Sequence, residues 1–214
     1  PEDVSPPEYF WGYNRMTSIE GLFGAGDAVG GTPHAFSSGS FTEGRLAAKA
    51  ACQYIDDGKA EGIVVSDAQI ERRKKEIYKP LEHYKTYRNA IAAGDVNPHY
   101  INPEQGLDRL QKLMDEYCGG VTVNYMTNEK LLNIGLKKLA IMEEDLEKLA
   151  AEDIHELLRA WELKHRHRAA ECVTQHTLFR KETRWPGYYY RGDAMKVDDE
   201  NWHVLTVSRR DPQT

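Results

Sequence analysis

The residues best suited to chemistry in this 214-residue chain are the glycines, serines and one aspartate between residues 24 and 41. Glycine permits positive φ angles and lets a ligand approach the backbone closely, so the glycines around Asp27 favour a tight cofactor-binding turn. A helix is expected directly afterwards, and the free N–H groups of a helix N-terminus favour an electron-rich group. We therefore predict a cofactor-binding site composed of Gly26, Asp27, Ser37, Ser38, Gly39, Ser40 and Phe41.

Three short elements must position these residues. We expect a short buried strand through Leu22 and Phe23, followed by the glycine-rich turn and a polar loop that contains His34. A helix should then run from Ser40 to about Ile55 and stop near Gly58. This helix is rich in alanine and glycine, which would allow a large flat group or a sheet to pack close to its axis.

Two long motifs in this region carry a family resemblance. The strings GLFGAGDAVGG and HAFSSGSFTEGRLAAKAA resemble the second flavin-binding segment of the fumarate reductase/succinate dehydrogenase flavoproteins. Within that family, the form GDAVGGTPHAFSSGSFTEGR is most similar to the alpha subunits of dissimilatory adenylylsulfate reductases. The run DDENW at residues 198–202 resembles the C-terminal part of the same family, so the resemblance touches both ends of the chain.

The resemblance implies a cofactor, a reaction and partners. The cofactor would be non-covalent FAD, with Asp27 holding the ribityl chain and Ser40 and Phe41 contacting the flavin. The reaction would be the two-electron reduction of adenylyl sulfate to sulfite and AMP, or its reverse, at N5 of the flavin. Electrons would come from iron–sulfur clusters in a beta subunit. The N-terminal remainder of the same flavoprotein would complete the active site.

Within the loop, His34 is a candidate to hydrogen-bond the flavin or the substrate, and a structural loop histidine is the alternative. Arg45 on the following helix is a weaker candidate for binding an anionic group, the alternative being an ion pair within the fold. Fumarate reductases carry a loop like HGANRLGG, whose arginine serves the active site, whereas this chain reads HAFSSGSF. The missing arginine argues against a dicarboxylate substrate.

Two other functions remain open. The first is a fumarate reductase-like or aspartate oxidase-like flavoprotein, which keeps the cofactor but changes the substrate. The second is a non-enzymatic helical docking module, in which the glycine-rich turn would be only structural. Flavin content and a comparison of the two substrate classes would separate these alternatives.

Composition narrows the classes of partner. The net charge of −6 gives no sign of nucleic-acid binding, and no apolar run is long enough to span a membrane. The three cysteines form no CxxC motif, which suits a cytoplasmic protein and predicts no metal or iron–sulfur site in this chain. The first GxGxxG fingerprint of a dinucleotide-binding fold is absent and the chain begins at Pro1, so we expect the C-terminal portion of a longer polypeptide.

We predict an α+β fragment that is mostly α. Residues 1–60 would be the end of a Rossmann-like FAD-binding domain, residues 61–180 a helical-bundle domain, and residues 181–214 an irregular tail that could form a subunit interface. Asn102 and Pro103 should begin one helix, and Thr127–Glu129 another. A further helix should begin at Glu152–Asp153 with an inward face of Ile154, Leu157, Leu158, Trp161, Ala169, Cys172 and Val173. His165 and His167 should point to different faces of this helix, which is poor metal-ligand geometry.

Overall fold

The computed structural model describes residues 11–29, 37–60, 62, 64–90, 97–204, 206 and 208 of the chain. His34 therefore lies outside the described residues, and for Asp27 only the main chain is described. The chain divides into two compact units, Pro1–Ser66 and Asp67–Thr214.

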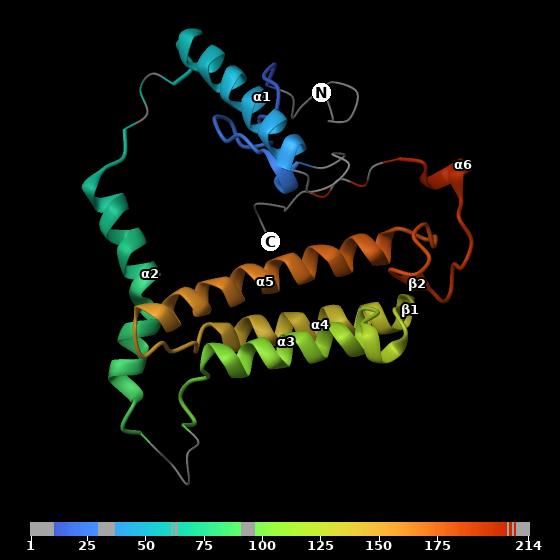
Figure 1. The fold of residues 1–214 in the computed structure, drawn as a ribbon. Coiled ribbons are helices and arrows are strands. Elements are labelled where there is room, and N and C mark those ends of the chain that lie inside the picture. Colours follow the sequence, from blue (N-terminus) through green and yellow to red (C-terminus); the bar gives the residue numbers. More distant parts are fainter. Residues whose placement is uncertain are drawn as a thin grey trace. The chain divides into compact units, whose positions relative to one another are not determined.

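The first unit consists of a folded loop, residues 11–29, packed on helix α1 (Ser37–Asp56) (Figure 1). The loop doubles back on itself, because Thr17 N donates to Leu22 O at 2.7 Å and Gly24 N donates to Arg15 O at 2.9 Å. It leads into a short 3₁₀ helix, η2 (Gly26–Ala28). The rings of Tyr13 and Phe23 meet the ring of Tyr54 edge to face, which fastens the loop to α1.

The predicted helix is confirmed, although it begins at Ser37 rather than at Ser40, whereas the predicted strand is wrong. Met16 and Phe23 form one isolated antiparallel bridge, and Leu22 is exposed rather than buried. A strand is stabilised by a ladder of backbone hydrogen bonds to its neighbours. Within the described part of this unit, the segment at Phe23 forms a β-bridge only with Met16 of the same loop. The segment is therefore part of a tight turn and not of a strand.

The second unit is a helical bundle with a short two-stranded sheet. Helices α3 (Pro103–Tyr117), α4 (Glu129–Leu146) and α5 (Ile154–Phe179) lie side by side, and α2 (Asp67–Tyr87) crosses α5 near its N-terminal end (Figure 1). Strands β1 (Met126–Thr127) and β2 (Tyr190–Arg191) pair in parallel, with Met126 opposite Tyr190. Two short helices, η3 (Val121–Val123) and α6 (Asp199–Trp202), complete the described elements of this unit.

Polar caps begin the helices of the bundle where the sequence predicts them. Asn102 forms a capping box with Gln105: Asn102 Oδ1 accepts from Gln105 N at 2.8 Å, and Gln105 Oε1 accepts from Asn102 N at 3.1 Å. Asn128 caps α4 by accepting from Leu131 N, and Asp153 caps α5 by accepting from Glu156 N. These predicted helix starts are confirmed.

The core lies between α3, α4 and α5. Its buried side chains are Leu110, Leu113, Leu139, Met142, Leu146, Leu149, Ala160, Leu163 and Ala170. Gly106 brings α3 close to α5, because a Cβ at this position would lie 2.4 Å from Cδ2 of Leu163. The predicted bundle is therefore confirmed, and the chain is mostly helical as expected.

The predicted inward face of α5 is largely wrong. Ile154 is 64% exposed, Leu158 56% and Val173 55%. The buried residues of the helix are Leu157, Ala160, Leu163, His167, Ala170 and Thr174. Two polar residues can lie on this buried face because their side chains are hydrogen-bonded. Nε2 of His167 lies 2.8 Å from Leu139 O, and Thr174 Oγ1 donates to Ala170 O.

The tail, residues 181–204, contains little regular secondary structure but is held by hydrogen bonds and ion pairs. Arg191 is buried, and its guanidinium donates to Leu178 O and Arg180 O at the C-terminal end of α5 while also pairing with Asp193. A cation at a helix C-terminus satisfies free carbonyls and complements the helix dipole. Of the helices in the part of the chain that the structure describes, none has the length and apolar character needed to cross a membrane.

Candidate cofactor-binding site

The glycine-rich turn and the first turn of α1 meet at Gly26 and Ser40. Gly26 has a φ of +63°, and a Cβ at this position would lie 3.3 Å from Oγ of Ser40. The backbone at residue 26 therefore passes close beside the start of α1, and a side chain at residue 26 would hinder this close approach. The structure brings together these two predicted site residues.

Among the described residues of this unit, the side chains at the amino end of α1 are largely exposed. Ser37, Ser38, Ser40 and Phe41 are exposed, and Phe41 retains 81% of its surface. The first turn of this 20-residue helix contains no acidic side chain that would neutralise its N–H groups. Such an end can donate hydrogen bonds to an electron-rich group, and an exposed aromatic ring beside it can cover an apolar one.

An ion pair that sequence reasoning missed holds this end of α1 in place. Arg15 and Glu43 form a two-point contact in which Nε donates to Oε2 and Nη2 donates to Oε1, the latter at 3.0 Å. Glu43 is buried on α1, one turn after Ser40, and Arg15 has a left-handed backbone with φ of +66°. Nothing in the spacing of these two residues identifies them as partners.

At the other end of α1, the tyrosines act as structural hydrogen-bond donors. Tyr13 donates to Oδ2 of Asp57 at 2.7 Å, and this bond raises the pKa of Tyr13 to about 12. Burial raises the pKa of Tyr54, whose hydroxyl donates to Lys59 O. Both phenols stay protonated at neutral pH, so neither is suited to act as a base. Arg45 is exposed and makes no ion pair with another described residue.

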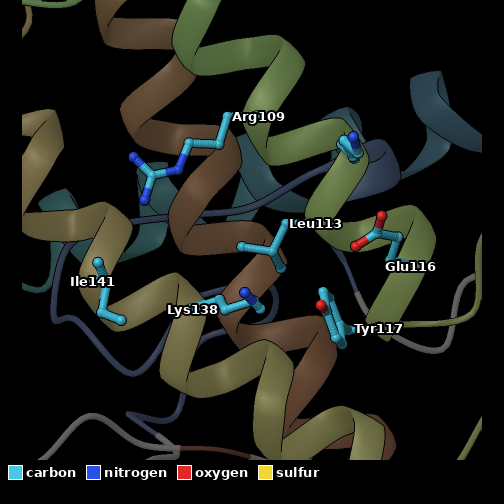
Figure 2. A pocket seen from close by; sticks show the side chains of 7 residues that line it. Arg109, Leu113, Glu116, Tyr117, Lys138 and Ile141 are labelled. Atoms are coloured by element: carbon cyan, nitrogen blue, oxygen red, sulfur yellow. The ribbon is translucent and has the colours of Figure 1, made fainter.

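The second unit offers a shallow groove between α3 and α4, of about 220 Å³ (Figure 2). Two of its cations have partners: Arg109 pairs with Asp145, and Lys138 lies over the ring of Tyr117 at 5.3 Å. The groove also carries Glu116, Lys112 and the apolar side chains of Leu113 and Ile141. This mixture of charges fits a solvated surface better than a site for one ligand.

The histidines of α5 are not gathered into a site. Nε2 of His167 is buried against the carbonyl of Leu139, whereas His165 is exposed beside Trp161. No group of three or more histidine, cysteine, aspartate or glutamate side chains among the described residues could hold a metal ion. In the tail, Trp185 and Tyr188 are exposed, and Trp202 packs edge to face on Phe179.

Comparison with known proteins gives the wider context. A family model described as fumarate reductase flavoprotein C-term matches residues 107–214. The adenylylsulfate reductase alpha subunit of Megalodesulfovibrio gigas is 43% identical over 94% of this chain, which covers 30% of that protein. An uncharacterized FAD-dependent oxidoreductase of Methanocaldococcus jannaschii is 27% identical over 86% of the chain and is covered to 31%.

Comparison with solved structures gives similarity to the same enzymes. The adenylylsulfate reductase of Archaeoglobus fulgidus is 55% identical over 94% of this chain, with a TM-score of 0.86, and 32% of it is covered. A structure with the same scores is an adenosine-5-phosphosulfate reductase with sulfite as a covalent adduct. The quinol fumarate reductase of E. coli, at 24% identity and a TM-score of 0.60, shares the fold. The chain thus spans about a third of the length of the relatives it matches.

Proposed function

Because this chain belongs to the fumarate reductase flavoprotein C-terminal family, we propose that it forms the C-terminal part of an FAD-containing catalytic subunit. The observation that carries this proposal is the close approach of Gly26 to Ser40, beside the exposed side chains that begin α1. In this proposal, Asp27 holds the ribityl chain, and Gly26 together with residues 37–41 forms one side of the flavin site.

The proposed reaction is the two-electron reduction of adenylyl sulfate to sulfite and AMP, or its reverse. The identities of 43% and 55% to adenylylsulfate reductases support this substrate over a dicarboxylate. Bound FAD would supply the two-electron chemistry. The remainder of the polypeptide and an iron–sulfur beta subunit are the proposed partners, and the cytoplasm is the proposed compartment.

The residues of this chain would bind and orient the cofactor. The first N–H groups of α1 would donate hydrogen bonds to an electron-rich edge of the flavin and stabilise negative charge there. Phe41 would cover the ring and exclude water, and the pair formed by Arg15 and Glu43 would hold α1 against the turn. His34 would hydrogen-bond the flavin or the substrate.

A test of the flavin site uses Asp27→Ala in the intact polypeptide. Loss of a charged hydrogen bond should weaken FAD binding by roughly 1.5–3 kcal/mol, which is about 10- to 150-fold in the dissociation constant. The measurement is the flavin-to-protein ratio after gel filtration, followed by titration of the apoprotein with FAD. The matched control is Asp56→Ala, which removes an exposed carboxylate at the C-terminal end of α1 and should leave FAD binding as in the unmodified protein.

The two alternatives predict different results. A non-enzymatic docking module would carry no flavin in the intact protein, and Asp27→Ala would then change nothing. A fumarate reductase-like or aspartate oxidase-like enzyme would bind FAD and respond to Asp27→Ala, but would not turn over adenylyl sulfate.

A further inference from the structure

A buried carboxylate lies just behind the amino end of α1. Glu43 is buried on this helix and comes three residues after Ser40, at the start of the next helical turn. The Cα–Cβ bonds of a helix lean toward its amino end, so the side chain of Glu43 starts out toward the first turn of α1. Burying a charge is costly unless the charge is paired, and Glu43 therefore needs a cation as its partner.

Arg15 provides this cation from the loop that precedes the helix. Its guanidinium makes the two-point contact with the carboxylate of Glu43, and the two side chains are 18% and 8% exposed. Paired contacts of this kind are among the stronger hydrogen bonds between charged groups. Between residues 37 and 48 the other charged residue is Arg45, which is exposed. The buried charge behind the start of α1 is therefore cancelled by Arg15.

The main chain of Arg15 also holds the glycine-rich turn. Gly24 N donates to Arg15 O at 2.9 Å, two residues before Gly26. Arg15 itself has a φ of +66°, which is uncommon for a residue other than glycine and persists where the surrounding structure holds it. One residue thus joins both parts of the candidate site, the turn through its carbonyl and α1 through its guanidinium.

We propose that Arg15 is a positioning residue of the flavin site whose charge, by cancelling that of Glu43, sets the reduction potential of the bound flavin. The inference rests on the proposed function, because it needs a flavin at the start of α1. Reduced flavin is richer in electrons than oxidised flavin. An unpaired carboxylate behind the helix start would therefore disfavour the reduced form, and an unpaired guanidinium would favour it.

The distance along α1 is short enough for such an effect. Glu43 comes six residues after Ser37, and a helix rises about 1.5 Å per residue, so the two residues are about 9 Å apart along the axis. This is close to the screening length of about 8–10 Å at physiological ionic strength, and buried charges are screened less than exposed ones. We therefore expect one uncancelled charge to change the ratio of reduced to oxidised flavin by about tenfold, which is about 30 mV for a two-electron couple.

The test is the midpoint potential of FAD in the intact polypeptide, measured by reductive titration followed by flavin absorbance. Glu43→Gln leaves an arginine that stays charged, so it should raise the potential by about 30 mV. Arg15→Gln leaves the carboxylate without its partner and should lower the potential. The double variant contains neither charge, so its potential should return to that of the unmodified polypeptide.

Opposite shifts that cancel separate this proposal from a purely structural role of the ion pair. Shifts of the same sign in the two single variants, or a double variant shifted further than either, would overturn it, as would unchanged potentials. Arg15→Lys keeps the charge and should keep the unmodified potential. Where one single variant does not retain FAD, the sign of the shift in the other decides.

The matched control is Asp56→Asn, which removes the same charge as Glu43→Gln from an exposed residue at the far end of α1. Asp56 comes 16 residues after Ser40, about 24 Å along the axis and well beyond the screening length, so the potential should not change. A polypeptide that binds no FAD would overturn the proposed function and this inference together. Bound FAD whose potential does not respond to the pair would overturn this inference alone.

Discussion

At Gly26 the backbone adopts a φ of +63°, and a Cβ there would lie 3.3 Å from Oγ of Ser40. Sequence alone identified the glycines and the serines because their types suit a tight turn and a helix start. It could not identify Arg15 as the partner of Glu43, because an ion pair between residues 28 positions apart leaves no periodic signal. Nor did it predict the charged network of the tail, where buried Glu182 accepts from Arg180 and Arg184.

Substituting two glycines of the first unit should have opposite effects. Gly26→Ala places a Cβ in a left-handed conformation and against Ser40, which should cost about 1–2 kcal/mol. Gly44→Ala lies within α1 with no atom within 4 Å of the new Cβ, and should gain up to about 1 kcal/mol from helix propensity. Thermal unfolding of the intact polypeptide checks both; midpoints that move in the same direction would argue against this account of the turn.

The ionic network of the tail should make stability depend on pH in the acid range. Burial alone would raise the pKa of Glu182, but hydrogen bonds from Arg184, Asp198 N and Arg180 outweigh it and lower the pKa to about 2. Its stabilising contribution is therefore complete above its ordinary value of 4.5 and is lost as the pH falls toward about 2. Hydrogen bonds from Arg191 likewise lower the pKa of Asp193 to about 2.

Glu182→Gln tests this network. The variant leaves two arginines without their buried partner, so it should lose about 3–5 kcal/mol at neutral pH. Urea unfolding should also show a weaker dependence on pH between about 4.5 and 2 than in the unmodified protein, with the remainder due to Asp193. A variant as stable as the unmodified protein at pH 7 would show that the network contributes little.

Among the elements, the starts of α3, α4 and α5 could be predicted, because Asn102, Asn128 and Asp153 cap them by local hydrogen bonds. The orientation of α5 could not. Both sides of this helix carry apolar residues, so periodicity does not reveal which side faces α3 and α4. The structure resolves the choice through Gly106 and Leu163, which allow a close approach of two helices, and through the satisfied polar groups of His167 and Thr174.

The approach of α3 to α5 can be tested at Gly106. Gly106→Ala would place a Cβ 2.4 Å from Cδ2 of Leu163, a buried side chain with little room to move. Overpacking of this kind costs about 1–3 kcal/mol, more than the helix propensity that alanine gains. Chemical denaturation of the intact polypeptide should therefore show a lower midpoint. An increase in stability would mean that the two helices are less closely packed than the structure indicates.

On the scale of the whole molecule, the chain forms two compact units, and the relatives that it matches are about three times its length. The described part of the first unit presents the turn at Gly26 beside the exposed side chains that begin α1. In the proposed function, further residues of a longer flavoprotein would supply the rest of the flavin site and of the active site.

The most direct test is to incubate the intact, FAD-loaded polypeptide and the proposed iron–sulfur partner with a reduced electron donor and either adenylyl sulfate or fumarate. We expect sulfite and AMP to form in equal amounts from adenylyl sulfate and no succinate to form from fumarate. Formation of succinate without release of sulfite would contradict the proposed function.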